Sequence, residues 1–141
     1  MSFLQTLDIS ASGLYAQRKR MNVISDNLAN METTRTAEGG PYRRKVVVMS
    51  SRDMGDSFDA VFNRRLKGVR IDAVVPDTKP FKKVFNPGHP DADEDGYLLK
   101  PNVDLVVETT NLLMARRAFE ANLTAMKMTK QMALKALEIG R

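Results

Sequence analysis

The chain has 141 residues, of which 43% are hydrophobic and 28% charged, a composition that fits a foldable domain of ordinary size and excludes permanent disorder. It has no cysteine, which excludes disulfides and thiolate metal sites, and its only histidine, His89, stands between Gly88 and Pro90 as a solvated loop residue would. The formal net charge is +5, and no basic start or long apolar run predicts a cleaved secretory signal or a transmembrane segment.

Residues 3–30 are predicted to form a long helix that takes part in a coiled coil. One apolar residue recurs every seven positions, at Leu7, Leu14, Met21 and Leu28, and Ile24 lies in the companion row. No proline interrupts the segment, which would span about 40 Å as a helix.

A run of weak helix formers follows within the same helix: Asn22, Ser25, Asp26, Asn27 and Asn30. These residues should make the isolated helix fray. We expect their side chains to be satisfied by neighbouring chains, where polar groups fix the register of packed helices.

Residues 35–100 lose the seven-residue repeat and gain glycine, proline and β-branched residues, which predicts a small β region. The turns are expected at EGGP (38–41) and FNPGHP (85–90). The strand candidates are KVVVM (45–49), FDAVF (58–62), VRIDAVV (69–75), FKKVF (81–85) and YLL (97–99).

A second long helix is predicted from about Asn102 to Ile139. Pro101 followed by Asn102 suggests its start, because the residue before a proline avoids helix and Asn can cap the first free amides. A seven-residue row runs through Leu105, Leu112, Phe119, Met126 and Ala133, with Ala115 and Leu123 beside it.

The predicted fold is therefore mainly α with a small β insert: an N-terminal axial helix (1–34), a central β and loop region (35–100) and a C-terminal axial helix (101–141). Each helix has an apolar stripe that the small sheet cannot cover, and ordering a long helix costs about 1–2 kcal/mol per residue in backbone entropy. Packing between several copies would cover the stripes. The alternative is that the two helices pair within one monomeric domain.

Motifs for catalysis and cofactors are weak or absent. DADEDG (91–96) matches the first half of a calcium-binding loop, but the twelfth position, which should be Glu, is Asn102. No phosphate loop, dinucleotide fingerprint or HExxH motif occurs. We therefore expect neither an enzyme nor a bound cofactor or metal.

Charge is segregated along the chain. Arg18–Arg20 and Arg43–Lys45 are basic blocks, whereas Asp91, Asp93, Glu94 and Asp95 form an acidic one. The basic blocks permit the alternative of a monomeric helical domain that binds nucleic acid, for which the aromatic residues are sparse. The segregation suits head-to-tail or lateral contacts between copies at least as well.

Four stretches resemble the bacterial flagellar axial proteins of the rod and hook. SGLYAQRKRMNVISDNLANMETT (12–34) is similar to their amino-terminal signature, and residues 102–140, with the core ARRAFEAN, resemble their terminal helix. PYRRKVVVM and PFKKVFNPGHPDADEDGYLLKPNVDLV (80–106) are similar to the proximal-rod branch.

The resemblance implies a non-enzymatic structural subunit of the flagellar basal-body proximal rod, part of the hollow drive shaft that transmits torque and passes exported subunits. It implies export through the flagellar type III apparatus without a cleaved signal, and a place in the periplasm. The implied partners are further copies, other rod proteins, the MS ring and its rod adaptor protein, and the rod cap with its peptidoglycan hydrolase; neither nucleic acid nor direct membrane insertion is implied.

The sequence repeat and the resemblance together predict two sets of assembly contacts. In the N-terminal helix they are Leu7, Leu14, Arg20, Met21, Asn22, Ile24, Asn27, Leu28 and Asn30, with Ala29 beside them. In the C-terminal helix they are Leu105, Leu112, Ala115, Arg117, Phe119, Glu120, Asn122, Leu123 and Met126, with Ala121 beside them.

Overall fold

The computed structural model describes residues 3–53 and 67–140, and within these ranges the chain forms two long helices and two antiparallel pairs of strands. The strand candidate at 58–62 lies outside the described residues. The elements in chain order are α1 (Phe3–Ala29), β1 (Lys45–Asp53), β2 (Lys67–Pro76), β3 (Lys82–Phe85), β4 (Tyr97–Lys100) and α3 (Leu105–Ile139).

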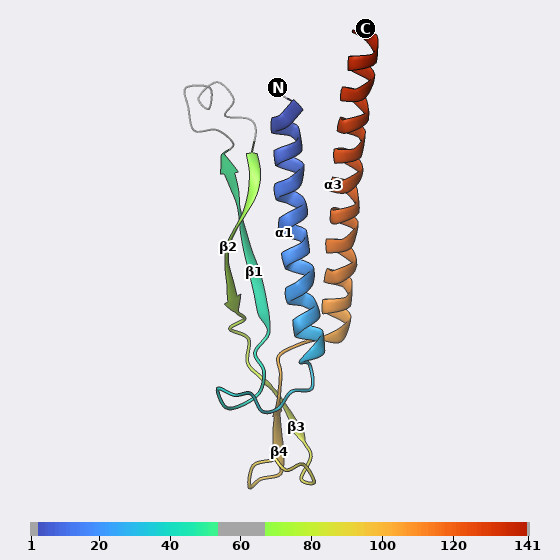
Figure 1. Cartoon of the computed structure of the whole chain (residues 1–141). Coiled ribbons are helices and arrows are strands. Elements are labelled where there is room, and N and C mark those ends of the chain that lie inside the picture. The colour runs from blue at the N-terminus through green and yellow to red at the C-terminus, as the bar shows by residue number, and fades with distance from the viewer. Residues whose placement is uncertain (1–2, 54–66, 141) are drawn as a thin grey trace.

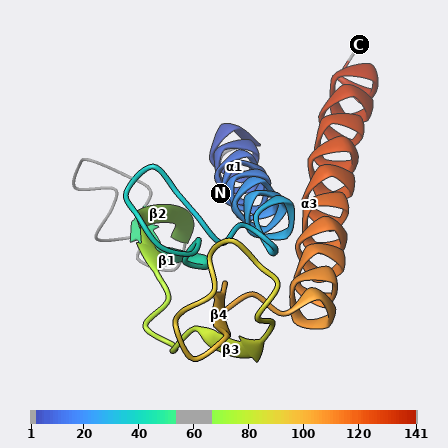
Figure 2. The same ribbon diagram turned by 90° about the horizontal axis from the view of Figure 1, so that it is seen from below.

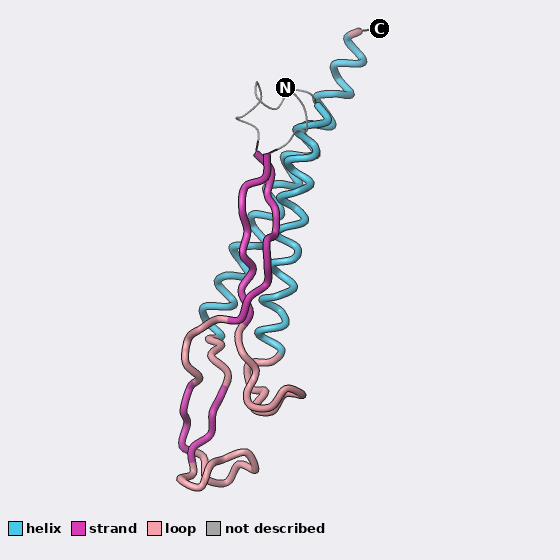
Figure 3. The backbone as a smooth tube through the Cα atoms, turned by 90° about the vertical axis from the view of Figure 1, so that its left-hand side faces the viewer, coloured by secondary structure: helices cyan, strands magenta, loops and turns pink. Residues whose placement is uncertain are grey.

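Helix α1 lies in the middle of the molecule. It runs antiparallel to α3 on one side and carries the β1–β2 hairpin on the other, while the β3–β4 hairpin projects from the end at which α3 begins (Figures 1 and 2). The tube view shows β1–β2 following the helices along their length (Figure 3). The predicted mainly helical fold with a small β insert is confirmed.

The β region consists of two separate antiparallel pairs. β1 pairs with β2 from Lys45–Pro76 to Asp53–Lys67, with an irregularity between Val48 and Met49, and β3 pairs with β4. The four strand candidates within the described residues are confirmed, and so are the predicted turns at 38–41, ahead of β1, and at 85–90, between β3 and β4. The amide of Val69 donates to Ser12 Oγ at 3.1 Å, which ties β2 to α1.

Small residues bring α1 and α3 close together. Ala16 and Ala115 are fully buried, and a Cβ atom built on Gly13 would lie 2.9 Å from Asn122 Nδ2. A larger residue at position 13 would therefore displace the Asn122 side chain from its place against α1. The alternative expectation was that the two helices pair within one chain. It holds for α1, because the buried residues of α1 pack against α3 and the β1–β2 pair.

The predicted start of the second helix is wrong by about three residues. Its N-cap is Asp104, whose carboxylate accepts from the amides of Val106 and Val107, while Asn102 lies before the helix and binds elsewhere. Two capping residues were available two positions apart. The Asn102 side chain binds the backbone of Arg44 and Lys79, whereas one oxygen of Asp104 accepts from both helix amides. The predicted end at Ile139 is confirmed.

Candidate functional site

Six polar side chains join the two helices to the hairpins at one end of the bundle. We call this group the polar junction; its members are Asn27, Tyr42, Arg44, Asp77, Asn102 and Glu108. Glu108 and Asn27 have no exposed surface, and Asn102 and Tyr42 are also buried. Buried groups of this kind destabilise a fold unless they are hydrogen-bonded, so their partners decide what the junction does.

Asn27, in the last turn of α1, uses its whole hydrogen-bonding capacity. Its Nδ2 donates to the carbonyl of Lys45 at 2.9 Å and to Glu108 Oε2 at 3.1 Å. Its Oδ1 accepts from the amide of Lys45 at 2.9 Å and from Tyr42 Oη at 3.0 Å. One side chain therefore pairs with both backbone groups of Lys45, the first residue of β1, as a neighbouring strand would.

For Asn27 this finding corrects the expectation that the polar residues of the first helix bond to other chains; Asn22, Ser25 and Asp26 are exposed, and for them it stays a prediction. Asn27 is satisfied within its own chain, and Ser10 Oγ donates to the carbonyl of Thr6. The weak helix former at residue 27 is retained because it links α1 to β1 and α3.

Arg44 connects the two carboxylates of the junction. Its Nε and Nη2 donate to Glu108 Oε1 at 2.9 and 2.7 Å, and its Nη1 donates to Asp77 Oδ2 at 3.0 Å. Burial by itself would lower the pKa of Arg44, but the hydrogen bonds to Glu108 and Asp77 raise it overall. Desolvation, with the charges of Asp26 and Glu108, raises the pKa of Tyr42, which stays a neutral donor.

Asn102 and Arg43 hold the segment after β2 against the junction. Asn102 Oδ1 accepts from the amide of Arg44 at 2.8 Å, and its Nδ2 donates to the carbonyl of Lys79 at 3.0 Å. Arg43 donates to the carbonyl of Asp77 and stacks over Phe81 at 4.2 Å. The second basic block is thus engaged inside the chain, which leaves less basic surface for nucleic acid than the sequence suggested.

We expect the fold to lose stability in acid through two aspartates. The Lys79 amide, followed by Arg44, lowers the pKa of Asp77 below 3.8, and the amides of Val107 and Val106 do the same for Asp104. A carboxyl group with a depressed pKa in the folded state stabilises that state at every pH above its unfolded pKa, and this contribution is lost as pH falls through the folded value. The urea midpoint should therefore hold steady above about pH 5 and fall below about pH 4.

Asp104→Asn provides the control, because it keeps a capping oxygen but removes the titration. Its urea midpoint should fall less steeply between pH 4 and pH 2 than that of the unchanged chain. Parallel curves for the two proteins would contradict the assignment to Asp104.

The predicted assembly residues differ in how far one chain covers them. Ile24, Asn27 and Ala115 are buried within the chain. The partly covered residues are Leu7, Leu14, Arg20, Met21, Leu28, Asn30, Leu112, Phe119, Asn122, Leu123 and Met126. The exposed residues are Asn22, Leu105, Arg117 and Glu120.

The structure brings several of these residues together across the two helices. Leu14 and Phe119 line one hollow at the groove between α1 and α3, and Asn122 lies against Gly13. Much of the predicted heptad surface thus forms the contact between the chain's own helices.

A second apolar row on α3 was missed by the sequence reasoning. We call it the α3 side stripe; its members are Val107, Met114, Ala121, Ala125, Met128, Met132 and Ile139, and all are exposed. Their spacing keeps them in one sector of the helix, about a third of a turn from the row that faces α1. Thr110, Ala118 and Ala136 fill the other positions of that sector, so no charge interrupts it. The repeat of seven from residue 107 was the available signal.

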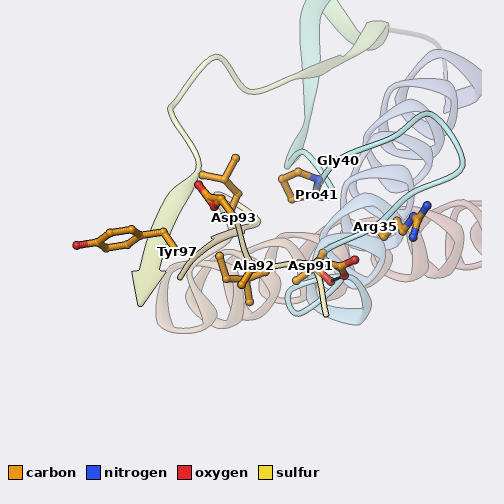
Figure 4. Close-up of a pocket in the computed structure, with 10 residues that line it drawn as sticks. Arg35, Gly40, Pro41, Asp91, Ala92, Asp93 and Tyr97 are labelled. Atoms are coloured by element: carbon orange, nitrogen blue, oxygen red, sulfur yellow. Dashed lines mark hydrogen bonds between the residues drawn. The ribbon is translucent and has the colours of Figure 1, made fainter. Parts of the chain in front are cut away.

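A hollow of 460 Å³ lies between the 34–41 loop and the 91–99 segment, but it has no arrangement for chemistry. Thr34 Oγ1 donates to Asp91 Oδ2 at 2.8 Å across its edge, and the Tyr97 side chain points away from the other labelled residues (Figure 4). In the described ranges no three His, Asp or Glu side chains are placed to hold a metal ion. Neither of the two described helices is long and apolar enough to cross a membrane.

Comparison with known proteins gives matches at both ends of the chain and along its whole length. A family model described as "Flagella basal body rod protein" matches residues 7–35, and one described as "Flagellar basal body rod FlgEFG protein C-terminal" matches residues 94–139. The chain is 44% identical to the flagellar basal-body rod protein FlgC of Bacillus subtilis (strain 168), over 100% of both chains. It is 39% identical to FlgC of Salmonella typhimurium, again over 100% of both. Its identity to FlgC of Borreliella burgdorferi is 38%, over 99% of this chain and 98% of the relative.

Proposed function

Because the chain belongs to the flagellar basal-body rod protein FlgC family and is a structural, non-enzymatic subunit of the rod, we propose that it polymerises there through the outer surfaces of its two terminal helices. Assembly with other rod proteins follows from the family.

The α3 side stripe is the observation that carries the proposal. A helix exposed along an uncharged apolar row marks a protein contact, since a monomer gains nothing from leaving such a row in water. Val107 at the start and Ile139 at the end of α3 belong to the same row, so the contact extends along the whole helix. Lateral packing of one subunit against the next would cover it.

The predicted assembly residues divide between two roles under this proposal. The predicted residues that are buried or partly covered within the chain, such as Ala115 and Asn122, pack α1 against α3. They thereby form the helix pair whose outer surface neighbouring subunits contact. The exposed ones, Asn22, Leu105, Arg117 and Glu120, lie where a neighbouring subunit can reach them directly.

We further propose a proximal position in the rod, next to the MS ring and its adaptor protein, as part of the drive shaft that transmits torque. We also propose that the chain is exported through the flagellar type III apparatus into the periplasm. There it would assemble into the rod under the rod cap with its peptidoglycan hydrolase. The resemblance of residues 80–106 to the proximal-rod branch supports it.

Deletion of the gene in the chain's own host tests the proposal. Cells without it should not swim, their isolated basal bodies should lack a completed rod, and expression of the intact chain should restore both. In restored cells, gold-labelled antibody against the chain should mark the rod segment beside the MS ring. Completed rods in the deletion strain would overturn the rod role, and a label near the hook would overturn the proximal position.

A further inference from the structure

Every exposed methionine in the described part of the chain lies in the α3 side stripe. The three residues are Met114, Met128 and Met132, which are 57%, 59% and 64% exposed. Met128 follows Met114 by close to four helical turns and precedes Met132 by about one, so the three thioethers line up along one side of the helix. One surface of the free chain thus presents these reactive sulfur atoms to solvent.

The other methionines of the described residues are partly covered by the chain itself: Met21, Met31, Met49 and Met126. Met126 is the most informative of them, because it lies on α3 two residues before Met128 but on the row that faces α1. Side chains two residues apart on a helix point in nearly opposite directions. Met126 therefore provides an internal reference for the reactivity of Met128 on the same helix.

A solvated thioether reacts with a hydroperoxide in a two-electron step. The sulfur attacks one oxygen of hydrogen peroxide, and the S–O bond forms as the O–O bond breaks. The transferred oxygen gives up its proton to the departing hydroxide, which leaves as water. The thioether is thereby oxidised to a sulfoxide and the peroxide is reduced. The reaction requires contact between peroxide and sulfur, which the free chain allows at the stripe and restricts at Met126.

A sulfoxide changes the surfaces against which the stripe can pack. Its oxygen accepts hydrogen bonds and stays solvated in the free chain, but a lateral contact would bury it among apolar side chains. Two threonines, Thr110 and Thr129, lie in or beside the stripe, and each donates its hydroxyl hydrogen to the carbonyl four residues earlier at 2.8 Å. Neither threonine therefore offers a free donor to the sulfoxide, and its burial would oppose assembly.

We propose that Met114, Met128 and Met132 form a peroxide-sensitive surface whose oxidation to sulfoxide excludes the free chain from the rod. This inference rests on the proposed function, because it requires a neighbouring subunit to cover the α3 side stripe. It adds a covalent modification that decides whether the stripe can be covered. Once a reduced chain has assembled, the neighbouring subunit shields the same sulfur atoms from peroxide.

Peptide mass spectrometry of the purified full chain during exposure to hydrogen peroxide tests the reactivity. Met114, Met128 and Met132 should each gain one oxygen several-fold faster than Met126, while the far-ultraviolet circular dichroism stays unchanged. Methionine sulfoxide reductase, supplied with a thiol reductant, should remove the added oxygen. Equal rates of oxidation at Met126 and Met128 would overturn the proposed peroxide-sensitive surface.

Matched variants in the deletion host test the consequence for assembly. The triple variant Met114→Leu, Met128→Leu, Met132→Leu keeps the stripe apolar but cannot form sulfoxides there. When new chains are produced under sublethal hydrogen peroxide, several-fold fewer cells with the unchanged chain than with the triple variant should regain swimming. Peroxide damage to other proteins is common to both strains. Met126→Leu leaves the stripe oxidisable, so it should behave as the unchanged chain does.

Isolated basal bodies give a measurement that needs no variant. After the same peroxide treatment, the unchanged chain in basal bodies should carry several-fold less sulfoxide at the stripe than the free chain from the same cells. Equal sulfoxide contents, or equal recovery of swimming by the unchanged chain and the triple variant, would overturn the exclusion of oxidised chains. Neither result would alter the swimming defect of the deletion strain, so the inference and the proposed rod role fail separately.

Discussion

Replacement of Glu108 by alanine is expected to lower the free energy of unfolding by about 3 kcal/mol or more. The side chain has no exposed surface, and its removal deprives Arg44 of two hydrogen bonds and Asn27 of one. The partly buried guanidinium of Arg44 would keep Asp77 as its only carboxylate partner, and the buried side-chain amide of Asn27 would lose one acceptor. Both changes destabilise the folded state, because water does not reach this site to replace the lost partners. Urea unfolding followed by far-ultraviolet circular dichroism measures the loss.

Glu120→Ala is the matched control on the same helix. Glu120 is exposed and pairs only with Arg116, four residues earlier, so its replacement should change the free energy of unfolding by less than about 0.5 kcal/mol. Glu108→Gln separates charge from shape, because it can still accept from Asn27 while losing the ion pair with Arg44. Equal stabilities of the Glu108→Ala and Glu120→Ala chains would show that the polar junction does not hold the helices to the hairpins.

The elements of the fold were predictable because their signals are local. Seven-residue repeats predicted the helices, and runs of β-branched residues between turn residues predicted the strands. Each signal lies within the segment that forms the element. The junction was not predictable in the same way, because Asn27 and Glu108 are 81 residues apart and each bond depends on the final packing. One signal was present: Glu108 lies four residues before Leu112 and seven before Ala115, on a row of α3 that is otherwise mostly apolar. A charge on a buried row requires a partner of opposite sign.

The assembly surface was only partly predictable for a related reason. A repeat of seven shows that a helix has an apolar row, but it does not say whether the chain's own second helix or another molecule covers that row. The row through Leu112 and Phe119 is half-covered by α1, whereas the α3 side stripe is left open. Sequence reasoning chose the first row and assigned it to other copies, because a covered row and an open row look alike without the packing of α1.

The α3 side stripe leads to the second large prediction: Met132→Asp should abolish swimming while leaving the isolated chain folded. Met132 is 64% exposed, so the new carboxylate remains solvated in the free chain and the free energy of unfolding should change by less than about 0.5 kcal/mol. In the rod the neighbouring subunit would bury that carboxylate without a cation, at a cost of several kcal/mol for each contact. Swimming assays, electron microscopy of isolated basal bodies and circular dichroism of the purified chain together measure both effects.

Two controls on the same turn of α3 separate the stripe from the added charge. Gln131→Asp introduces the same carboxylate about a quarter turn away, outside the stripe, and should preserve swimming. Met132→Leu keeps an apolar side chain of similar volume within the stripe and should also preserve it. If Met132→Asp cells swim and complete their rods, the α3 side stripe faces solvent in the rod and the subunits must pack through other surfaces. If all three variants fail, the cause is a general sensitivity of this turn, and lateral packing through the stripe loses its support.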